Sequence, residues 1–383
     1  MRVTGLELTN FRNLTAASLV PCEGVNVIFG ENAQGKTNLL EAIWLCSGGR
    51  SFRGSRESQM IQFQQEAFRV GLSFADRERE QQIWYQSAGG DRKKIQLNGV
   101  PLRTSSELAG EFLSVIFHPG DLSIVQEGPA ARRTFLDNAI SQIKPIYAKY
   151  LAQYNSVLEQ RGALLRQLAQ TGKKAGLLEI WDEQLARMGT AISIFRQDYL
   201  QKLSRVSSKI YGGFSGFEEE FSLCYESSVF PAETPLEIYD DVLIQQYRTS
   251  LQESLETDIR MRSTTRGIHR DDMDLKVNGL SARLYGSQGQ QRSCAIALKL
   301  GEAALLREIT GENPVILLDD VMSELDQGRQ DYLLNRIKGF QVFITCCDVV
   351  GPLRMEQGKV FRVTAGQVEE ISLEDLAEQP ATL

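Results

Sequence analysis

A glycine-rich segment near the N-terminus has the residue types needed to hold phosphates. Its spacing, G-x-x-x-x-G-K-[ST], is that of a phosphate-binding loop. The glycines let backbone amides wrap around phosphates, and a helix that follows would direct the positive end of its dipole at them. We expect Lys36 to contact the β- and γ-phosphates of ATP and the Thr37 hydroxyl to hold Mg²⁺. The predicted nucleotide-binding residues of the loop are Gly30, Glu31, Asn32, Ala33, Gln34, Gly35, Lys36 and Thr37. A buried strand before the loop and an amphipathic helix after it disfavour the alternative of a chance glycine-rich turn.

A second candidate is an apolar run, residues 315–318, that ends in Asp319 and Asp320. Such a strand would deliver a carboxylate to the metal, so Asp319 is predicted to hold Mg²⁺ together with Thr37. Asp320 stands where ABC-type ATPases generally have a glutamate that polarises the attacking water, and its side chain is one methylene shorter. Taken alone, such a pair is more often a strand end and a helix cap. A protein that binds ATP without hydrolysing it therefore stays a possible alternative.

Two further segments resemble ABC-type ATPase motifs. Residues 287–292 (SQGQQR) are similar to the signature, in which a serine and a glycine begin a helix. The hydroxyl of Ser287, with Gly289 and the helix N-terminus, would face the γ-phosphate bound by a second protomer. Alone, this segment could be only a capped helix start. Residues 323–326 (SELD) are similar to the D-loop, which lies across the dimer interface of these ATPases. The order of the four motifs indicates ATP sites shared between two protomers, with Lys36, Asp320 and Ser287 as the catalytic candidates.

The elements expected to position these residues alternate between strands and helices. Strands are predicted at 3–8, 25–29, 68–74, 81–85 and 94–97, with a helix at 37–46. Asn98-Gly99 and Asn278-Gly279 predict tight turns. From about residue 267 onward we expect a hairpin, a helix, an apolar strand, a second helix and a final strand. The fold class is therefore predicted to be α/β.

The middle of the chain, about 138–262, is predicted to be mainly helical. Apolar residues recur at four-three spacing in one stretch: Trp181, Leu185, Met188, Ile192, Phe195 and Tyr199. Two antiparallel helices of about 30 residues each would extend about 45 Å. A compact helical domain and a short coiled-coil-like arm both fit this pattern. We expect residues 1–137 and 265–383 to form an ABC-type P-loop ATPase lobe, and residues 138–264 to form an inserted, mainly helical lobe.

Composition limits the partners of this 383-residue chain. Its formal net charge is −7, so any contact with DNA must use a local basic patch. The six cysteines form no CxxC pair, and no stretch has the roughly 20 apolar residues of a membrane helix. We expect a reduced, soluble, cytoplasmic protein without a membrane partner. The candidate DNA contacts, each of which could instead be a solvated surface, are Arg50, Arg53, Arg56, Arg92, Lys93, Lys94, Lys173 and Lys174, with Arg132 and Arg133 as contacts across the two lobes.

Over essentially its whole length the chain resembles the RecF family of bacterial DNA replication and repair proteins, which are SMC-like ATPases. The resemblance is carried by residues 8–13 (LTNFRN), 49–53, 128–137, 267–272 (GIHRDD), 287–300 and 319–326. Ile268 replaces a proline of the family pattern, and Gly120 replaces an acidic residue. A switch histidine is absent after residues 342–344; Thr345 is a possible substitute. Residues 119–126 are the candidate Q-loop region.

The resemblance implies a DNA-binding clamp that ATP drives to dimerise and that slow hydrolysis to ADP and phosphate resets. It implies binding to single-stranded, double-stranded and junction DNA, and partnership with RecR and possibly RecO in loading recombinase at single-strand gaps. A place in DNA repair, replication and the SOS response to DNA damage is also implied. The alternative is the nucleotide-binding subunit of a membrane transporter. The long insertion before the signature and the missing switch histidine favour the clamp.

Overall fold

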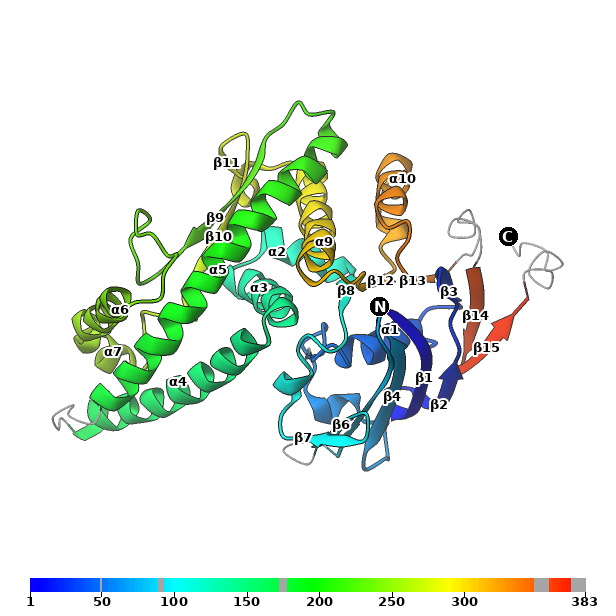
Figure 1. Ribbon diagram of the computed structural model, residues 1–383, viewed down its shortest axis with the longest axis horizontal. Coiled ribbons are helices and arrows are strands. Elements are labelled where there is room, and N and C mark those ends of the chain that lie inside the picture. Colours follow the sequence, from blue (N-terminus) through cyan, green and yellow to red (C-terminus); the bar gives the residue numbers. More distant parts are fainter. Residues whose placement is uncertain (49, 89–92, 172–177, 348–357, 373–383) are drawn as a thin grey trace. The chain divides into compact units, whose positions relative to one another are not determined.

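Two β-sheets enclose the helix that follows the phosphate-binding loop. The computed structural model describes residues 1–48, 50–88, 93–171, 178–347 and 358–372. The chain divides into two compact units, one formed by Met1–Asp121 with Glu302–Leu383 and the other by Leu122–Gly301. The first and the last strands of the chain belong to the same unit (Figure 1).

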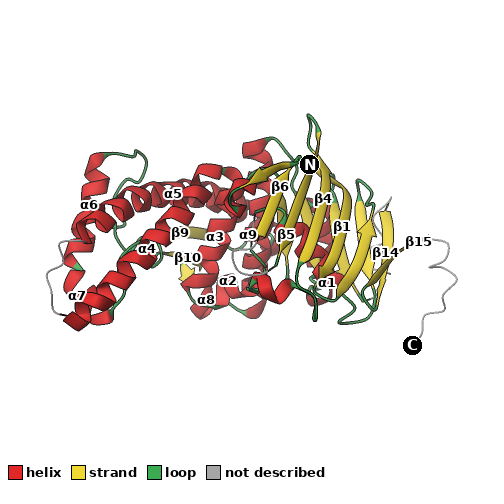
Figure 2. Ribbon diagram, turned by 90° about the horizontal axis from the view of Figure 1, so that it is seen from below, coloured by secondary structure: helices red, strands yellow, loops and turns green. Residues whose placement is uncertain are grey.

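The first sheet is antiparallel and confirms the predicted meander (Figure 2). Its strands, in spatial order, are β2 (Leu14–Leu19), β1 (Arg2–Phe11), β4 (Phe68–Ala75), β5 (Glu80–Ser87), β6 (Lys93–Leu97) and β7 (Val100–Leu102). Asn98 and Gly99 join β6 to β7 with φ angles of 52° and 78°, the left-handed values that a two-residue hairpin turn requires. The short 3₁₀ helix η1 (Glu57–Met60) precedes β4 in sequence, and η2 (Ser105–Leu108) follows β7.

The second sheet carries the motifs. Its order is β15 (Gln367–Ile371), β14 (Gly358–Thr364), β3 (Val25–Phe29), β13 (Val342–Cys346), β12 (Val315–Asp319) and β8 (Ser114–Phe117). All neighbours run parallel except β14 and β15. In the register, Thr345 of β13 lies opposite Asp319 of β12 and Ile28 of β3. The carboxyl ends of these three strands therefore meet at one edge, where ligands of open α/β sheets bind.

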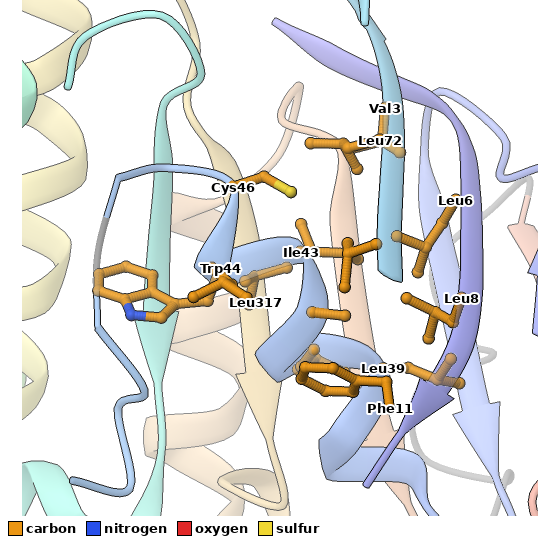
Figure 3. Close-up of a cluster of buried hydrophobic side chains, with 14 of the residues drawn as sticks. Val3, Leu6, Leu8, Phe11, Leu39, Ile43, Trp44, Cys46, Leu72 and Leu317 are labelled. Atoms are coloured by element: carbon orange, nitrogen blue, oxygen red, sulfur yellow. The ribbon is translucent and has the colours of Figure 1, made fainter. Parts of the chain in front are cut away.

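Helix α1 (Lys36–Leu45) packs between the two sheets. Eight of its ten residues are buried, including Leu39 and Ile43, so it has almost no solvent-facing side. Figure 3 shows these side chains between Leu6 and Leu8 of β1 and Leu317 of β12. Because one helix is held on both faces, the loop that precedes it is fixed by the core of the unit. The remaining elements here are η3 (Pro119–Asp121), η4 (Met322–Glu324) and α10 (Gln327–Arg336).

The unit Leu122–Gly301 combines helices with a small sheet. Its helices are α2 (Leu122–Gln126), α3 (Pro129–Ile143), α4 (Pro145–Thr171), α5 (Leu178–Ser215), α6 (Asp241–Glu253), α7 (Leu255–Met261), α8 (Ala282–Tyr285) and most of α9 (Gln288–Thr310). Strands β11 (Leu280–Ser281), β10 (Asp272–Val277) and β9 (Phe221–Glu226) form an antiparallel sheet. Helices α4 and α5 pack on each other and are about 40 and 57 Å long. The predicted pair of long helices is therefore present, and α6 and β9 pack on α5.

Arg161 ties the helices of this unit together. Its side chain is fully buried on α4, where Nε donates to Asp182 of α5 at 2.7 Å and Nη1 donates to Asp258 of α7 at 2.7 Å. Nη1 also donates to the hydroxyl of Thr264 at 2.9 Å. A guanidinium out of water is tolerated because these partners supply both charge and hydrogen bonds. None of the helices in the described part of the chain is long and apolar enough to cross a membrane.

The compact units differ in extent from the expected lobes. Residues 122–137 and 265–301 pack with the inserted helices, because α3 contacts α4 and α5 and because β10 pairs with β9. The boundaries of the compact units therefore lie after residues 121 and 301, whereas those of the predicted lobes lie after 137 and 264. The division into two functional lobes stays a prediction: an ATPase lobe of residues 1–137 and 265–383, and an inserted helical lobe of residues 138–264.

Candidate nucleotide-binding site

The loop between β3 and α1 has a backbone that requires glycine at two points. Gly30 has φ 151° and Gly35 has φ 119°, both in the region that side chains disfavour. A Cβ on Gly30 would lie 2.4 Å from the carbonyl oxygen of Val363, and one on Gly35 would lie 2.8 Å from Oδ1 of Asn13. No side chain of the described residues caps the start of α1, and its first turn contains no acidic residue. The positive end of this helix is therefore available for an anion.

Lys36 lies against this loop. The residue is only 7% exposed. Its ammonium donates to the carbonyl oxygens of Gly30 and of Glu31, the latter at 3.1 Å, and to Sγ of Cys347 at 3.4 Å. These partners, drawn from the described residues, are uncharged. The ammonium can therefore exchange them for phosphate oxygens, which offer both hydrogen bonds and opposite charge.

Thr37 and Asp319 meet across the edge of the parallel sheet. Thr37 Oγ1 donates to Asp319 Oδ1 at 2.7 Å, and the hydroxyl of Thr345 donates to the same oxygen at 2.9 Å. Burial raises the pKa of Asp319, and hydrogen bonds from the two threonines only partly oppose this effect. A hydroxyl beside a buried carboxylate fits Mg²⁺, which takes oxygen ligands and often one or two carboxylates together with phosphates. A cation there would also offset the cost of burying the charge.

Asp320 follows with a left-handed backbone, φ 54°. Its amide donates to Thr345 Oγ1 at 2.9 Å. Ser323 Oγ donates to the Asp320 carbonyl oxygen at 2.8 Å and to Oδ1 at 3.3 Å. The predicted D-loop, residues 323–326, spans the end of η4 and the N-cap of α10, where Asp326 accepts from the Arg329 amide at 3.0 Å. The two carboxylates predicted from the sequence thus occur together at the end of β12, with hydroxyl groups on both.

Asn13 is a contact of the loop that motif spacing did not indicate. It lies on the β1–β2 hairpin, where Nδ2 donates to the carbonyl oxygens of Ala33 at 3.2 Å and Gln34 at 2.9 Å. Its Oδ1 accepts from Asn38 of α1 at 2.7 Å. Gln34 Oε1 in turn accepts from the amide of Ala365. The loop is therefore contacted by two hairpin turns, β1–β2 and β14–β15, that lie far apart in sequence. The only sequence signal for Asn13 was its place in the family-like segment 8–13.

Ser287 lies in the other unit, before α9. Its Oγ accepts from the Gln290 amide at 3.2 Å, while Gln290 Oε1 accepts from the Ser287 amide at 2.8 Å. This reciprocal capping fixes the start of a 23-residue helix. Ser287 is exposed, and so are the apolar side chains of Leu284 and Tyr285 just before it. The segment is thus a capped helix start with an apolar surface beside it.

The basic candidates divide into several kinds. Arg132 is 3% exposed and donates to both carboxylate oxygens of Asp272, at 2.6 and 2.9 Å. The two residues form a structural ion pair within one unit. The expectation that Arg132 makes a contact across the two lobes is therefore wrong. Arg133 donates to the carbonyl oxygen of Asp271 in the same unit. Arg53 donates to Asn38 of α1 at 2.8 Å, and its charge partly opposes the rise that burial causes in the pKa of Asp319, so it lies near the glycine-rich loop. Arg50, Arg56, Lys93 and Lys94 are exposed, whereas Arg92, Lys173 and Lys174 fall outside the described residues.

The structure also describes the candidate switch residue, Thr345, and the candidate Q-loop region, residues 119–126. The hydroxyl of Thr345 is engaged by Asp319 and the Asp320 amide, and the residue is 1% exposed. Residues 119–126 form η3 and α2, and Gln126 Nε2 donates to Gln291 of the signature helix at 2.8 Å. Gln126 is therefore the glutamine of this region that contacts α9.

Comparison with known proteins agrees with this geometry. A family model described as "RecF/RecN/SMC N terminal domain" matches residues 2–368. The DNA replication and repair protein RecF of Caldanaerobacter subterraneus subsp. tengcongensis is 45% identical over 88% of this chain and 91% of its own length. RecF of Heliobacterium modesticaldum is 40% identical over 96% and 99%.

Solved structures extend the likeness. The recombination mediator protein RecF with ATP has a TM-score of 0.89 at 41% identity, covering 97% of this chain and 98% of that one. The Smc head domain of Pyrococcus furiosus has a TM-score of 0.54 at 17% identity over 98% of both chains, which shows a shared fold alone. The chain therefore has an SMC-like ATPase fold and belongs to the RecF family of DNA replication and repair proteins.

Proposed function

We propose that this chain is an ATP-dependent DNA-binding clamp that acts as a recombination mediator at single-strand gaps and junctions. ATP drives two copies together, and slow hydrolysis to ADP and phosphate separates them. The observation that carries the ATPase part is the 2.7 Å contact of Thr37 with Asp319, directly after the glycine-rich loop and at the edge where the parallel strands end. A P-loop threonine beside a strand-end carboxylate is the arrangement that Mg²⁺-dependent phosphoryl transfer needs.

In this mechanism the loop Gly30–Thr37 binds the triphosphate. The amides from Gly30 to Gly35 and the start of α1 surround the phosphates, and Lys36 pairs with the β- and γ-phosphates. Thr37 and Asp319 would hold Mg²⁺, which neutralises charge that develops on the phosphates during transfer. Asp320 orients the attacking water through its carboxylate. Slow hydrolysis is proposed from the resemblance to the RecF family, not from the length of this side chain.

The second protomer completes the site through Ser287 and Gly289. Ser287 is exposed at the start of a long helix, so its hydroxyl and the helix dipole can approach a γ-phosphate from outside the chain. Leu280, Leu284 and Tyr285 beside it are 58–71% exposed, and a dimer would bury them. ADP lacks the γ-phosphate, so it should leave the protein monomeric.

DNA binding is proposed from family membership and from local charge. The net charge of −7 requires a confined basic surface, and Arg50, Arg56 and Lys94 are exposed candidates. A RecF relative with a solved structure is described as a recombination mediator in the RecFOR pathway, which supports RecR and RecO as partners. A cytoplasmic location belongs to the same proposal. A transporter subunit is disfavoured, because the relatives compared above are DNA replication and repair proteins.

Sedimentation tests this proposal. The wild type should be monomeric alone and with ADP, and dimeric with Mg²⁺ and ATP. The Ser287→Arg monomer should bind ATP with the affinity of the wild-type monomer, because the loop Gly30–Thr37 is unchanged. This variant should not dimerise. Thr249→Arg, on an exposed position of α6, adds the same side chain and should dimerise normally. Equal dimerisation in ATP and ADP, or a Ser287→Arg dimer as strong as the wild type, would show that Ser287 only caps α9. Junction DNA should accelerate ATP hydrolysis by the wild type.

A further inference from the structure

Thr345 is a polar residue in an otherwise apolar stretch of strand. Val342, Phe343 and Ile344 precede it on β13, and all four residues are buried. A buried hydroxyl is unfavourable unless its hydrogen bonds are satisfied. Valine has nearly the same shape without that cost. The hydroxyl at this position therefore needs an explanation beyond packing.

Both hydrogen-bonding functions of this hydroxyl are directed at the end of β12. A hydroxyl has one proton to donate and lone pairs to accept with. Thr345 Oγ1 donates to Asp319 Oδ1 at 2.9 Å and accepts from the Asp320 amide at 2.9 Å. The parallel register places Thr345 directly opposite Asp319, which makes both contacts short. One side chain of β13 thus fixes two consecutive residues of β12.

The backbone of Asp320 needs such support. Its φ of 54° is left-handed, a conformation that costs free energy in a residue other than glycine and persists only when its surroundings hold it. Thr345 holds the amide of Asp320, and Ser323 holds its carbonyl oxygen at 2.8 Å. In an extended strand, successive side chains point to opposite faces. A left-handed residue breaks that alternation, so that both carboxylates can serve one site.

We propose that Thr345 is a positioning residue of the ATPase site, whose single hydroxyl orients the Mg²⁺-holding carboxylate of Asp319 and the backbone of the water-orienting Asp320. The inference rests on the proposed ATPase function. It also assigns Thr345 a role different from that of a γ-phosphate sensor. Because its proton and an acceptor site are already used by Asp319 and Asp320, Thr345 acts on the nucleotide through them.

Two substitutions separate the hydroxyl from the shape of the side chain. Thr345→Val keeps the shape and removes both hydrogen bonds, whereas Thr345→Ser keeps the hydroxyl. The matched control is Thr190→Val, the same change at a fully buried position of α5 in the other unit. Three quantities are measured for each protein: kcat and KM for ATP, the Mg²⁺ concentration that gives half-maximal binding of a fluorescent ATP analogue, and the melting temperature without nucleotide.

Thr345→Val should raise the half-maximal Mg²⁺ concentration about tenfold and lower kcat about 10- to 100-fold, as expected when a group that orients a metal ligand is lost. Binding of the analogue without Mg²⁺ should change by less than about twofold, because the loop Gly30–Thr37 is untouched. Thr345→Ser should restore both the Mg²⁺ requirement and kcat, and Thr190→Val should leave them at wild-type values.

The outcomes distinguish this inference from the function on which it rests. Wild-type Mg²⁺ requirement and kcat in Thr345→Val would overturn the role of Thr345, provided that Lys36→Ala still weakens ATP binding. The role of Thr345 would also be overturned if Thr345→Val melted at a lower temperature and lost binding of the analogue equally with and without Mg²⁺, and if Thr345→Ser did not restore these values. Such a result would indicate that Thr345 has a purely structural role. Absence of ATP binding in the wild type would instead overturn the proposed function itself.

Discussion

Replacing Lys36 with alanine removes the only side-chain charge that the glycine-rich motif itself supplies to the phosphates. A hydrogen bond to a charged group contributes about 1.5–3 kcal/mol. The residue is 7% exposed, so solvent screens this contact weakly. In the protein without nucleotide, however, the ammonium already contacts the carbonyls of Gly30 and Glu31 and the thiol of Cys347, and it must give up at least part of these contacts. We therefore expect a loss of about 1.5–2 kcal/mol, which is about a 10- to 30-fold weaker Kd for ATP.

Isothermal titration of the monomer with Mg²⁺ and ATP measures this loss directly. ADP should show a smaller loss, because Lys36 then pairs with the β-phosphate alone. Lys359→Ala is the control: this lysine lies on β14 of the same sheet and pairs with Glu370 at 2.9 Å. It should bind ATP like the wild type. An unchanged Kd in Lys36→Ala would refute the assignment of residues 30–37 as the phosphate-binding loop.

Three other substitutions test the site and the fold. Asp320→Asn should keep Mg²⁺-ATP bound and yield a long-lived dimer without turnover; hydrolysis at the wild-type rate, measured by phosphate release, would exclude the proposed role. Arg161→Met should cost about 3–5 kcal/mol in urea unfolding, because two buried carboxylates lose their partner, whereas Arg187→Met at an exposed pair should change little. Burial lowers the pKa of His269 from 6.5 to about 4, so the unfolded chain binds a proton in that window that the folded chain does not. The free energy of unfolding should therefore fall as pH drops from 6.5 to 4, and His269→Gln should remove up to about 3 kcal/mol of this fall. An equal pH dependence of unfolding in the wild type and in His269→Gln would contradict the lowered pKa of His269.

The conformation of the glycine-rich loop and the two carboxylates at the end of β12 were predictable because their signals are local. Gly30 and Gly35 are required by the backbone path of a single turn, and the apolar run before Asp319 is a strand buried on both faces. The two Asn-Gly turns were predictable for the same reason, since each needs only two residues with left-handed φ angles. Local motifs of this kind specify conformation without information about distant partners.

Contacts set by strand order could not be predicted in this way. Asn13 reaches the loop because β1 and β2 form a hairpin beside it, and Thr345 reaches Asp319 because β13 pairs with β12 in parallel. Neither pairing is encoded in the spacing of a motif. The same limit applies to Arg132, which was expected to make a contact across the two lobes, because its carboxylate partner, Asp272, lies 140 residues away in sequence. The compact units differ in extent from the predicted lobes for a related reason, because β10 pairs with β9 of the inserted segment.

The backbone of Asp320 gives a physical reason for the aspartate where a glutamate was expected. Aspartate is enriched among left-handed residues because its short carboxylate can hydrogen-bond locally, as Oδ1 does here with Ser323 at 3.3 Å. A glutamate would extend further toward the attacking water but would lose this local contact, and its backbone would be strained by roughly 1 kcal/mol more. Asp320→Glu should therefore bind ATP normally, unfold more easily and hydrolyse ATP no faster than the wild type. A single-turnover measurement in which Asp320→Glu hydrolyses ATP faster would show that reach limits the reaction, and that the left-handed backbone does not explain the aspartate.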